Sequence, residues 1–249
     1  MKKISSFLAV CCCILFANCS SNTHQEVEAP ADSMPDVQEE QVAVVEESSN
    51  MHNMDSLTKV LIKTTMGDIK IVLYDNTPKH KENFIQLVKN NYYTDVLFHR
   101  IIQGFMIQTG DPDSKGAPAG QQLGMGGPGY TIPAEFNAEN YHKRGAVAAA
   151  RNNNPAKASS GSQFYIVDGR KFAENELRQI EMQMGKHFTD AQKAVYMNVG
   201  GAPFLDGDYT VFGEVVEGMD VVDKIAAQPK DRFDRPKEDI KIIGVIIVE

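Results

Sequence analysis

Short, mostly apolar runs of β-prone residues follow one another from residue 57 onward, with polar residues and many Gly and Pro between them. Such runs, bounded by turn residues, are typical of β-strands. They predict strands at residues 60–65, 68–73, 96–102, 105–108, 145–150, 163–167 and 209–216. Residues 240–248 are almost continuously apolar and predict a buried closing strand.

Two segments have helical spacing instead. Residues 78–90 place apolar side chains three and four positions apart, with Thr77 as the expected N-cap and Pro78 at the first helical position. Residues 219–226 predict a second helix. Many short strands with only two framing helices favour a mostly β fold, a closed barrel, over parallel βαβ units.

Residues 173–199 interrupt this series of strands. Apolar side chains share one helical face in the first half, and Thr189 and Gln192 have the spacing of a capping box in the second. We expect a two-helix insertion on the barrel. The residues on the shared face are Leu177, Ile180 and Met184.

Charge is distributed unevenly along the 249 residues, whose formal net charge is −8. Residues 20–56 hold nine acidic residues and no Lys or Arg, so the remainder from residue 57 is nearly neutral. No basic stripe for nucleic acid is present in it. All four cysteines lie within residues 1–19, which excludes a disulfide framework, a thiolate zinc site and a cysteine nucleophile from the rest of the chain.

Residues 1–19 have the pattern of a targeting segment: a positive start, a short apolar run and then Cys19. A Cys at this place resembles the lipobox of bacterial lipoproteins, although Asn18 departs from the small residue usual before it; an ordinary secretory signal is the alternative. Residues 20–56 predict a disordered acidic linker. We therefore expect an exported protein, tethered to a membrane of the cell envelope by an acylated Cys19, with a folded domain at residues 57–249.

Several kinds of catalytic site are absent from the sequence. It contains neither the HExxH pair of zinc hydrolases nor a GxSxG nucleophile elbow. Residues 124–129 match GxGxxG literally, but Pro128 lies inside the motif and an extended segment follows it. A dinucleotide site needs a helix at that point, so we predict a tight loop instead.

Four blocks of sequence carry the positive signal: FHRIIQGFMIQTGDP at 98–112, GPGY at 127–130, GSQFYIV at 161–167, and LDG at 205–207 followed by VFG at 211–213. In this order they resemble the signature of cyclophilin-type peptidyl-prolyl cis-trans isomerases. The resemblance implies an eight-stranded antiparallel barrel capped by two helices, with a proline pocket on its outer face. It also implies a reaction that uses no cofactor and no metal.

The resemblance implies that Arg100 is the catalytic residue and that Gln108 and Gln163 orient the arginine and the substrate backbone. Rotation about an Xaa-Pro bond must cross a barrier of about 18–20 kcal/mol, because amide resonance holds the bond planar. At the twisted point the prolyl nitrogen becomes a hydrogen-bond acceptor. A permanently charged donor fixed beside it would stabilise the transition state more than either planar state.

The substrate-binding residues are also implied by the resemblance. Phe105, Met106, Tyr165 and Leu205 match positions around the proline ring, and Ala150 and Arg151 match a stretch whose main chain meets the peptide. Phe204 and Tyr209 match rim positions at which many members have Trp and His, and Tyr165 replaces the commoner Phe. Because the indole donor is missing, we predict weak inhibition by cyclosporin.

Three interpretations of the sequence are thus open. The leading interpretation is an isomerase that assists folding by accelerating rotation about Xaa-Pro bonds in exported or envelope proteins. Its partners would be proline-containing polypeptides, and we expect it to be a monomer. The second is a non-catalytic chaperone module that binds proline peptides, favoured by the altered rim and the insertion. The third is a structural lipoprotein that uses its acidic linker for assembly.

Overall fold

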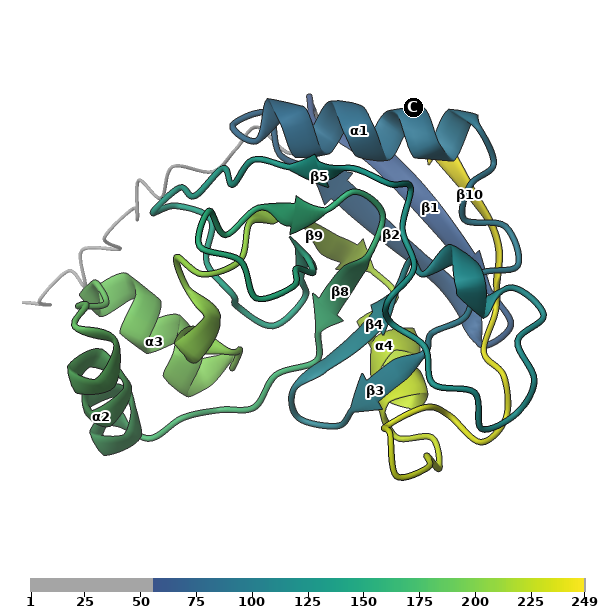
Figure 1. Cartoon of the computed structure of the whole chain (residues 1–249). Coiled ribbons are helices and arrows are strands. Elements are labelled where there is room, and N and C mark those ends of the chain that lie inside the picture. Colours follow the sequence, from purple (N-terminus) through teal and green to yellow (C-terminus); the bar gives the residue numbers. More distant parts are fainter. Residues whose placement is uncertain (1–55, 249) are drawn as a thin grey trace, which may run out of the picture. The chain divides into compact units, whose positions relative to one another are not determined.

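The computed structural model describes residues 56–248. Their main feature is an eight-stranded antiparallel sheet in the order β10-β1-β2-β9-β6-β8-β4-β3 (Figure 1). Its strands are β1 (Thr58–Thr64), β2 (Gly67–Leu73), β3 (Arg100–Ile102), β4 (Met106–Thr109), β6 (Ala146–Ala149), β8 (Phe164–Val167), β9 (Val211–Glu217) and β10 (Ile242–Val248). All eight predicted strands are present, with ends that differ by a few residues.

The predicted closure of the barrel is wrong: the sheet is a curled, open half-barrel whose end strands β3 and β10 do not pair. The two ends approach each other just before these strands, where Leu97 bridges to Lys241 and the Phe98 amide donates to the Ile240 carbonyl at 2.9 Å. Beyond this point β3 pairs with a loop, since the Ile101 amide donates to the Asp234 carbonyl at 2.8 Å. A three-residue strand is too short to extend the ladder further.

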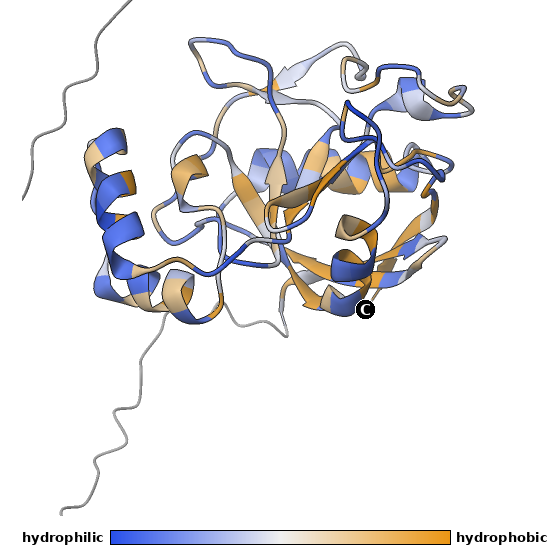
Figure 2. Ribbon diagram, turned by 90° about the horizontal axis from the view of Figure 1, so that it is seen from below, coloured by the Kyte–Doolittle hydropathy of each residue, from blue (hydrophilic) through white to orange (hydrophobic). Residues whose placement is uncertain are grey.

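The period of two in the strands separates two apolar layers. Val147, Phe164 and Ile166 belong to the core that fills the curl of the sheet, beneath the helices. Their neighbours Ala148 and Tyr165 belong to a second cluster on the opposite face. In Figure 2 the strands are the most hydrophobic parts of the ribbon. The outer face of the sheet is therefore apolar around Ala148 and Tyr165.

Two helices frame the sheet, as predicted. Helix α1 (Pro78–Lys89) packs against β10, and α4 (Met219–Ala226) packs against β2, β3 and β4 (Figure 1). Each buries one face, as amphipathic helices do. The buried residues are Phe84, Leu87 and Val88 in α1, and Val221, Val222 and Ile225 in α4.

The predicted two-helix insertion is also present, as α2 (Glu174–Met184) and α3 (Asp190–Asn198). Thr189 Oγ1 accepts from the Gln192 amide at 3.2 Å, and Gln192 Oε1 accepts from the Thr189 amide at 2.9 Å, so the predicted capping box is confirmed. The insertion has a small apolar cluster of its own. Its buried members are Phe172, Leu177, Phe188 and Tyr196.

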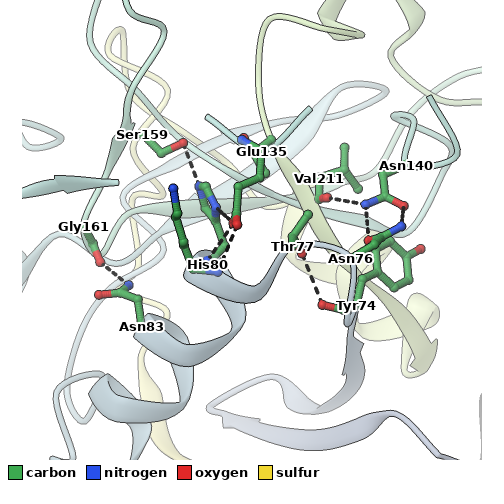
Figure 3. Close-up of polar contacts among 12 residues, drawn as sticks. Tyr74, Asn76, Thr77, His80, Asn83, Glu135, Asn140, Ser159, Gly161 and Val211 are labelled. Carbon is green, nitrogen blue, oxygen red and sulfur yellow. Dashed lines mark hydrogen bonds and ion pairs between the residues drawn. The ribbon is translucent and has the colours of Figure 1, made fainter. Parts of the chain in front are cut away.

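The start of α1 is capped by the side chain of a distant residue and not by that of Thr77, whose hydroxyl donates to the Tyr74 carbonyl at 3.3 Å. Both carboxylate oxygens of Glu135 accept backbone amides of the first turn, from Lys79 and His80, at 3.0 Å each (Figure 3). Glu135 also accepts from His80 Nδ1 at 2.6 Å, and His80 Nε2 lies 2.9 Å from Ser159 Oγ. Thr77 is thus the N-cap residue and Pro78 the first helical residue, as predicted, but the capping hydrogen bonds come from Glu135, a charged acceptor, and not from the Thr77 side chain.

The remaining elements are short. They are the 3-10 turns η1 (Pro112–Ser114) and η2 (Pro203–Leu205) and a two-stranded sheet of β5 (Thr131–Ile132) and β7 (Ser159–Ser160). The prediction that β10 is buried is wrong in part, since Ile243, Ile246 and Ile247 are exposed. No helix among residues 56–248 is both apolar enough and long enough to span a bilayer. The predicted signal segment 1–19, its Cys19 and the linker up to residue 55 lie outside the described residues.

Candidate active site

The β3–β4 hairpin places Arg100 directly opposite Gln108 on the outer face of the sheet. Gln108 in turn faces Tyr165 on β8, which faces Ala148 on β6. Three neighbouring strands thus present an arginine, an amide and an aromatic ring in one row. This arrangement follows from the strand register, because residues in register across a sheet point to the same face.

A cavity of about 130 Å³ opens beside this row. It gathers nine of the eleven residues predicted for catalysis and substrate binding: Arg100, Phe105, Met106, Gln108, Ala150, Arg151, Tyr165, Leu205 and Tyr209. Six of the nine residues are apolar or aromatic, and Arg100, Gln108 and Arg151 add polar and charged groups to the lining. The cavity therefore suits a small apolar ring bonded to a polar backbone.

The other two predicted residues lie beside the cavity. Phe204 is 44 % exposed, and its ring lies 5.4 Å from that of Phe105, centroid to centroid. Gln163 accepts a hydrogen bond from Gln108 Nε2 at 3.1 Å and donates to the Gly126 carbonyl at 2.7 Å. Gln163 thereby ties the floor of the site to the 124–129 loop, which is a loop with no helix after it, as predicted.

A second hollow of about 460 Å³ continues from the cavity past Gln108, Ala150 and Arg151. It runs between the 124–131 loop and residues 152–160. An extended peptide seated in the first cavity can therefore continue along the same surface. Ala150, at which the resemblance implies a main-chain contact with the peptide, lines both hollows.

The guanidinium of Arg100 is half-exposed and pairs with one carboxylate, with Nε 3.7 Å from Asp234 Oδ2. Asp234 is itself held by Lys230 at 2.7 Å. Within residues 56–248 Arg100 makes no other ion pair or hydrogen bond, including none to Gln108. Its remaining N–H groups are therefore available to a bound peptide. Sequence reasoning missed Asp234, which no motif marks.

Arg151 and Tyr209 form the far wall of the cavity. The Arg151 guanidinium lies over the Tyr209 ring at 4.7 Å, and its Nε donates to the Asp208 carbonyl at 2.7 Å. Tyr209 meets the Tyr165 ring edge-on at 5.9 Å. These contacts hold the rings of Tyr165 and Tyr209 as two aromatic walls of the cavity. The Arg151 guanidinium is engaged by the Tyr209 ring and the Asp208 carbonyl.

His99 lies behind Arg100 and is buried, with 4 % of its surface exposed. Neither of its ring nitrogens has a hydrogen-bond partner among the described residues. Burial lowers the pKa of His99 to about 4, although nearby Asp111 acts in the opposite direction. The residue beside Arg100 is therefore a neutral imidazole near pH 7.

Comparison with known proteins identifies the family. The model of the family described as "Cyclophilin type peptidyl-prolyl cis-trans isomerase/CLD" matches residues 59–247. The chain belongs to the cyclophilin family. Its activity is peptidyl-prolyl cis-trans isomerisation, as the sequence signature implies.

Curated bacterial relatives agree. The cyclophilin is 36 % identical over 195 residues to a Staphylococcus saprophyticus protein named for peptidyl-prolyl cis-trans isomerase activity, covering 77 % of this chain and 92 % of that one. It is 41 % identical over 192 residues to a Streptococcus pyogenes protein named for both phosphatase and isomerase activities. There the match covers 74 % of this chain and 37 % of the relative, so the cyclophilin spans about a third of that protein's length.

Solved structures show the same fold. A cyclophilin-type isomerase of Cryptosporidium parvum matches with a TM-score of 0.57 and 26 % identity, covering 78 % of this chain and 98 % of that one. A second crystal structure of that protein, determined in the presence of the dipeptide Ala-Pro, matches with a TM-score of 0.55 and the same identity.

Within residues 56–248 of this cyclophilin no three His, Cys, Asp or Glu side chains form a metal-binding group.

Proposed function

We propose that this cyclophilin catalyses rotation by holding the prolyl ring in the 130 Å³ cavity while Arg100 donates to the twisting amide. The observation that carries the proposal is the gathering of Arg100 with eight other predicted residues around one hollow. Aromatic and thioether walls hold the ring without bonding to the amide, so they leave it free to rotate. The cationic donor acts where the prolyl nitrogen gains its lone pair.

The proposed roles of the side chains follow from their places. Arg100 is the catalytic residue, and Gln108 borders both the cavity and the neighbouring hollow, where its free amide oxygen can accept from a peptide N–H. Gln163 holds Gln108 in place. Proline-containing peptides are the substrate class, in keeping with the Ala-Pro dipeptide used with the Cryptosporidium relative.

The test is the cis/trans exchange rate of a short Ala-Pro peptide, measured by NMR with wild type, Arg100→Ala and Arg100→Lys. Loss of one charged donor in a preorganised site typically costs about 10²–10³ in kcat. We expect a loss of this size for Arg100→Ala and a smaller one for Arg100→Lys, which keeps the charge without the planar fork. Equal exchange rates with wild type and Arg100→Ala would contradict the mechanism. Peptide binding without acceleration by wild type would favour a chaperone module.

We also propose that the cyclophilin acts on exported or envelope proteins while tethered by an acylated Cys19. The pattern of residues 1–19 and the acidic stretch that follows support this proposal. A Cys19→Ser variant expressed in the native host should lose the mass of the lipid and move from the membrane fraction to the soluble fraction. If the variant and wild type show the same mass and the same distribution, the tether is wrong.

A further inference from the structure

The floor of the proline pocket is fixed from behind by a buried hydrogen bond. Tyr165, whose ring lines the cavity, has its hydroxyl 2.9 Å from His142 Nε2. His142 is fully buried, and its ring is stacked at 14° on that of Tyr165 with 6.0 Å between the centroids. The polar end of Tyr165 is therefore engaged outside the pocket, which receives only its ring.

The chain of hydrogen bonds continues to Asp206 and to helix α3. His142 Nδ1 lies 2.8 Å from Asp206 Oδ1, and Tyr196 Oη lies 2.6 Å from Asp206 Oδ2. The His142 amide donates to the same Oδ1 at 2.9 Å. We name Tyr165, His142, Asp206 and Tyr196 the relay. It joins β8, beneath the pocket, to the two-helix insertion.

Elementary chemistry fixes the direction of each hydrogen bond in the relay. An ionised carboxylate only accepts, so His142 Nδ1 and Tyr196 Oη must donate to Asp206. With its proton on Nδ1, His142 can accept at Nε2 from the Tyr165 hydroxyl. Burial raises the pKa of Tyr165 and of Tyr196 well above the ordinary value, so both hydroxyls remain donors. The relay is therefore a continuous chain of hydrogen bonds from Tyr165 to Tyr196.

The relay also holds a second wall of the pocket. Asp206 directly follows Leu205, a pocket residue, and ends the η2 turn. The Ala202 amide at the other end of this segment donates to the His142 carbonyl at 2.8 Å. Gly201 makes this approach possible, because a Cβ there would lie 2.2 Å from the His142 oxygen and 2.7 Å from the Tyr196 ring. Floor and wall thus share one buried support.

We propose that Asp206 and Tyr196 are positioning residues of this isomerase, through which the α2–α3 insertion sets the shape of the proline pocket. The inference rests on the proposed function, because it concerns the same cavity. The carboxylate of Asp206 orients His142, His142 orients the Tyr165 ring, and the Tyr196 hydroxyl keeps Asp206 and the adjoining Leu205 in register with α3. The insertion thereby determines how well the prolyl ring fits.

The relay affects binding of the prolyl ring and not the donor Arg100. Arg100 is on β3 and is restrained by Asp234, which is outside the relay. If Tyr165 is held less firmly, the prolyl ring loses contacts that it makes equally in the planar and the twisted states of the substrate. An equal loss of binding energy in both states raises KM and leaves kcat nearly unchanged.

The test uses the full chain and a short Ala-Pro peptide as probe, with kcat and KM measured for wild type and Tyr196→Phe. The substitution removes one hydroxyl from a buried charge-assisted bond and keeps the ring. We expect KM to rise about three- to tenfold, the equivalent of one ordinary hydrogen bond, because the loss reaches the pocket only through His142 and Tyr165, and we expect kcat to change less than about twofold. Tyr141→Phe is the matched control, since its ring packs on Tyr196 at 5.7 Å while its hydroxyl is not in the relay.

A second control separates the relay from packing. Phe188→Leu removes the ring that packs edge-on against Tyr196 at 5.5 Å and so loosens the apolar cluster of the insertion, while every hydrogen bond of the relay is kept. We expect it to lower the unfolding temperature and to leave KM unchanged. An unchanged KM in Tyr196→Phe, or an equal rise in Phe188→Leu, would overturn the proposal.

A double-mutant cycle tests the connection itself. Tyr165→Phe disconnects the pocket from the relay, so adding Tyr196→Phe to it should raise KM by less than Tyr196→Phe does alone. Additive effects would contradict the relay. If wild type bound the peptide without accelerating exchange, the proposed function would fail, and the same cycle measured on the dissociation constant would still decide the relay.

Discussion

Arg100 and Asp234 form an ion pair between the end strand of the sheet and the loop that follows α4, with Nε and Oδ2 3.7 Å apart. Asp234 does not touch the cavity, so its effect on the reaction comes through the guanidinium that it restrains. Both side chains are roughly a third or more exposed, which keeps the pair weak, at about 0–1 kcal/mol.

Asp234→Asn should therefore lower kcat by at most about fivefold, since the guanidinium loses orientation and keeps its charge. Exchange NMR on the Ala-Pro peptide measures this effect. Asp220→Asn, which makes the same change of charge on exposed α4, is the control and should match wild type. A loss as large as that of Arg100→Ala would mean that Asp234 itself takes part in catalysis.

Glu135 gives a prediction for stability. Glu135→Gln replaces a carboxylate that caps two amides of α1 and binds His80, so we expect a loss of about 1–2 kcal/mol in the free energy of unfolding. Urea denaturation measures the loss. The control is Glu82→Gln on exposed α1 surface, for which the change should stay within about 0.5 kcal/mol. Equal effects of the two substitutions would show that Glu135 does not act as the cap.

The same carboxylate predicts a dependence on pH. Burial acts to raise the pKa of Glu135, but hydrogen bonds from His80 and from the two amides outweigh it and hold the pKa below its usual value. The ionised Glu135 therefore contributes fully to the free energy of unfolding at pH values above the usual pKa of a glutamate. This contribution is lost as the pH falls through the lowered pKa of Glu135 in the folded protein. In Glu135→Gln this part of the acid destabilisation should disappear from urea titrations at successive pH values.

His99 predicts a loss of stability at higher pH values than Glu135. Its pKa is about 4 in the folded protein and near 6.5 when unfolded, so below pH 6.5 the unfolded chain takes up the proton first. Between pH 6.5 and 4 the free energy of unfolding should fall by roughly 3 kcal/mol on this account. His99→Phe should remove this dependence of the free energy of unfolding on pH, whatever the substitution does to the stability at pH 7. A slope identical to that of wild type would mean that His99 is protonated in the fold.

Cyclosporin inhibition tests the altered rim. Phe204 lies at the edge of the pocket against Phe105 and offers no hydrogen-bond donor. Phe204→Trp supplies an indole N–H, so the inhibition constant should fall by roughly fivefold, the equivalent of one ordinary hydrogen bond. Phe204→Leu, which lacks the donor and the ring, should not improve inhibition. If wild type is already inhibited as tightly as Phe204→Trp, the missing donor has no effect.

Local patterns in the sequence were sufficient wherever local chemistry decides the structure. Helix α4 has the predicted bounds because its apolar spacing is strong and Gly218 precedes it. The row of Arg100, Gln108 and Tyr165 follows from a tight hairpin and from strands of period two. The candidate site residues themselves were named before the fold was known only because the blocks at 98–112 and 161–167 resemble the cyclophilin signature.

The remaining features depend on residues that are distant along the chain. Thr77 has good capping chemistry, yet Glu135 supplies a stronger acceptor from another loop. His142 and Asp206 lie 64 residues apart and carry no spacing that marks them as partners. The barrel stays open because the Asp234 carbonyl binds the β3 amide that closure would use, which no periodicity reveals.

The loop after α4 also covers the outer edge of β3. An end strand with free amides and carbonyls invites a second chain to add to it, and such contacts lead to aggregation. Here the Asp234 carbonyl accepts the Ile101 amide, and the Lys230 ammonium donates to the Ile101 carbonyl at 3.1 Å. The backbone groups of Ile101 that a second chain would pair with are thus already bound by the segment whose carboxylate pairs with Arg100.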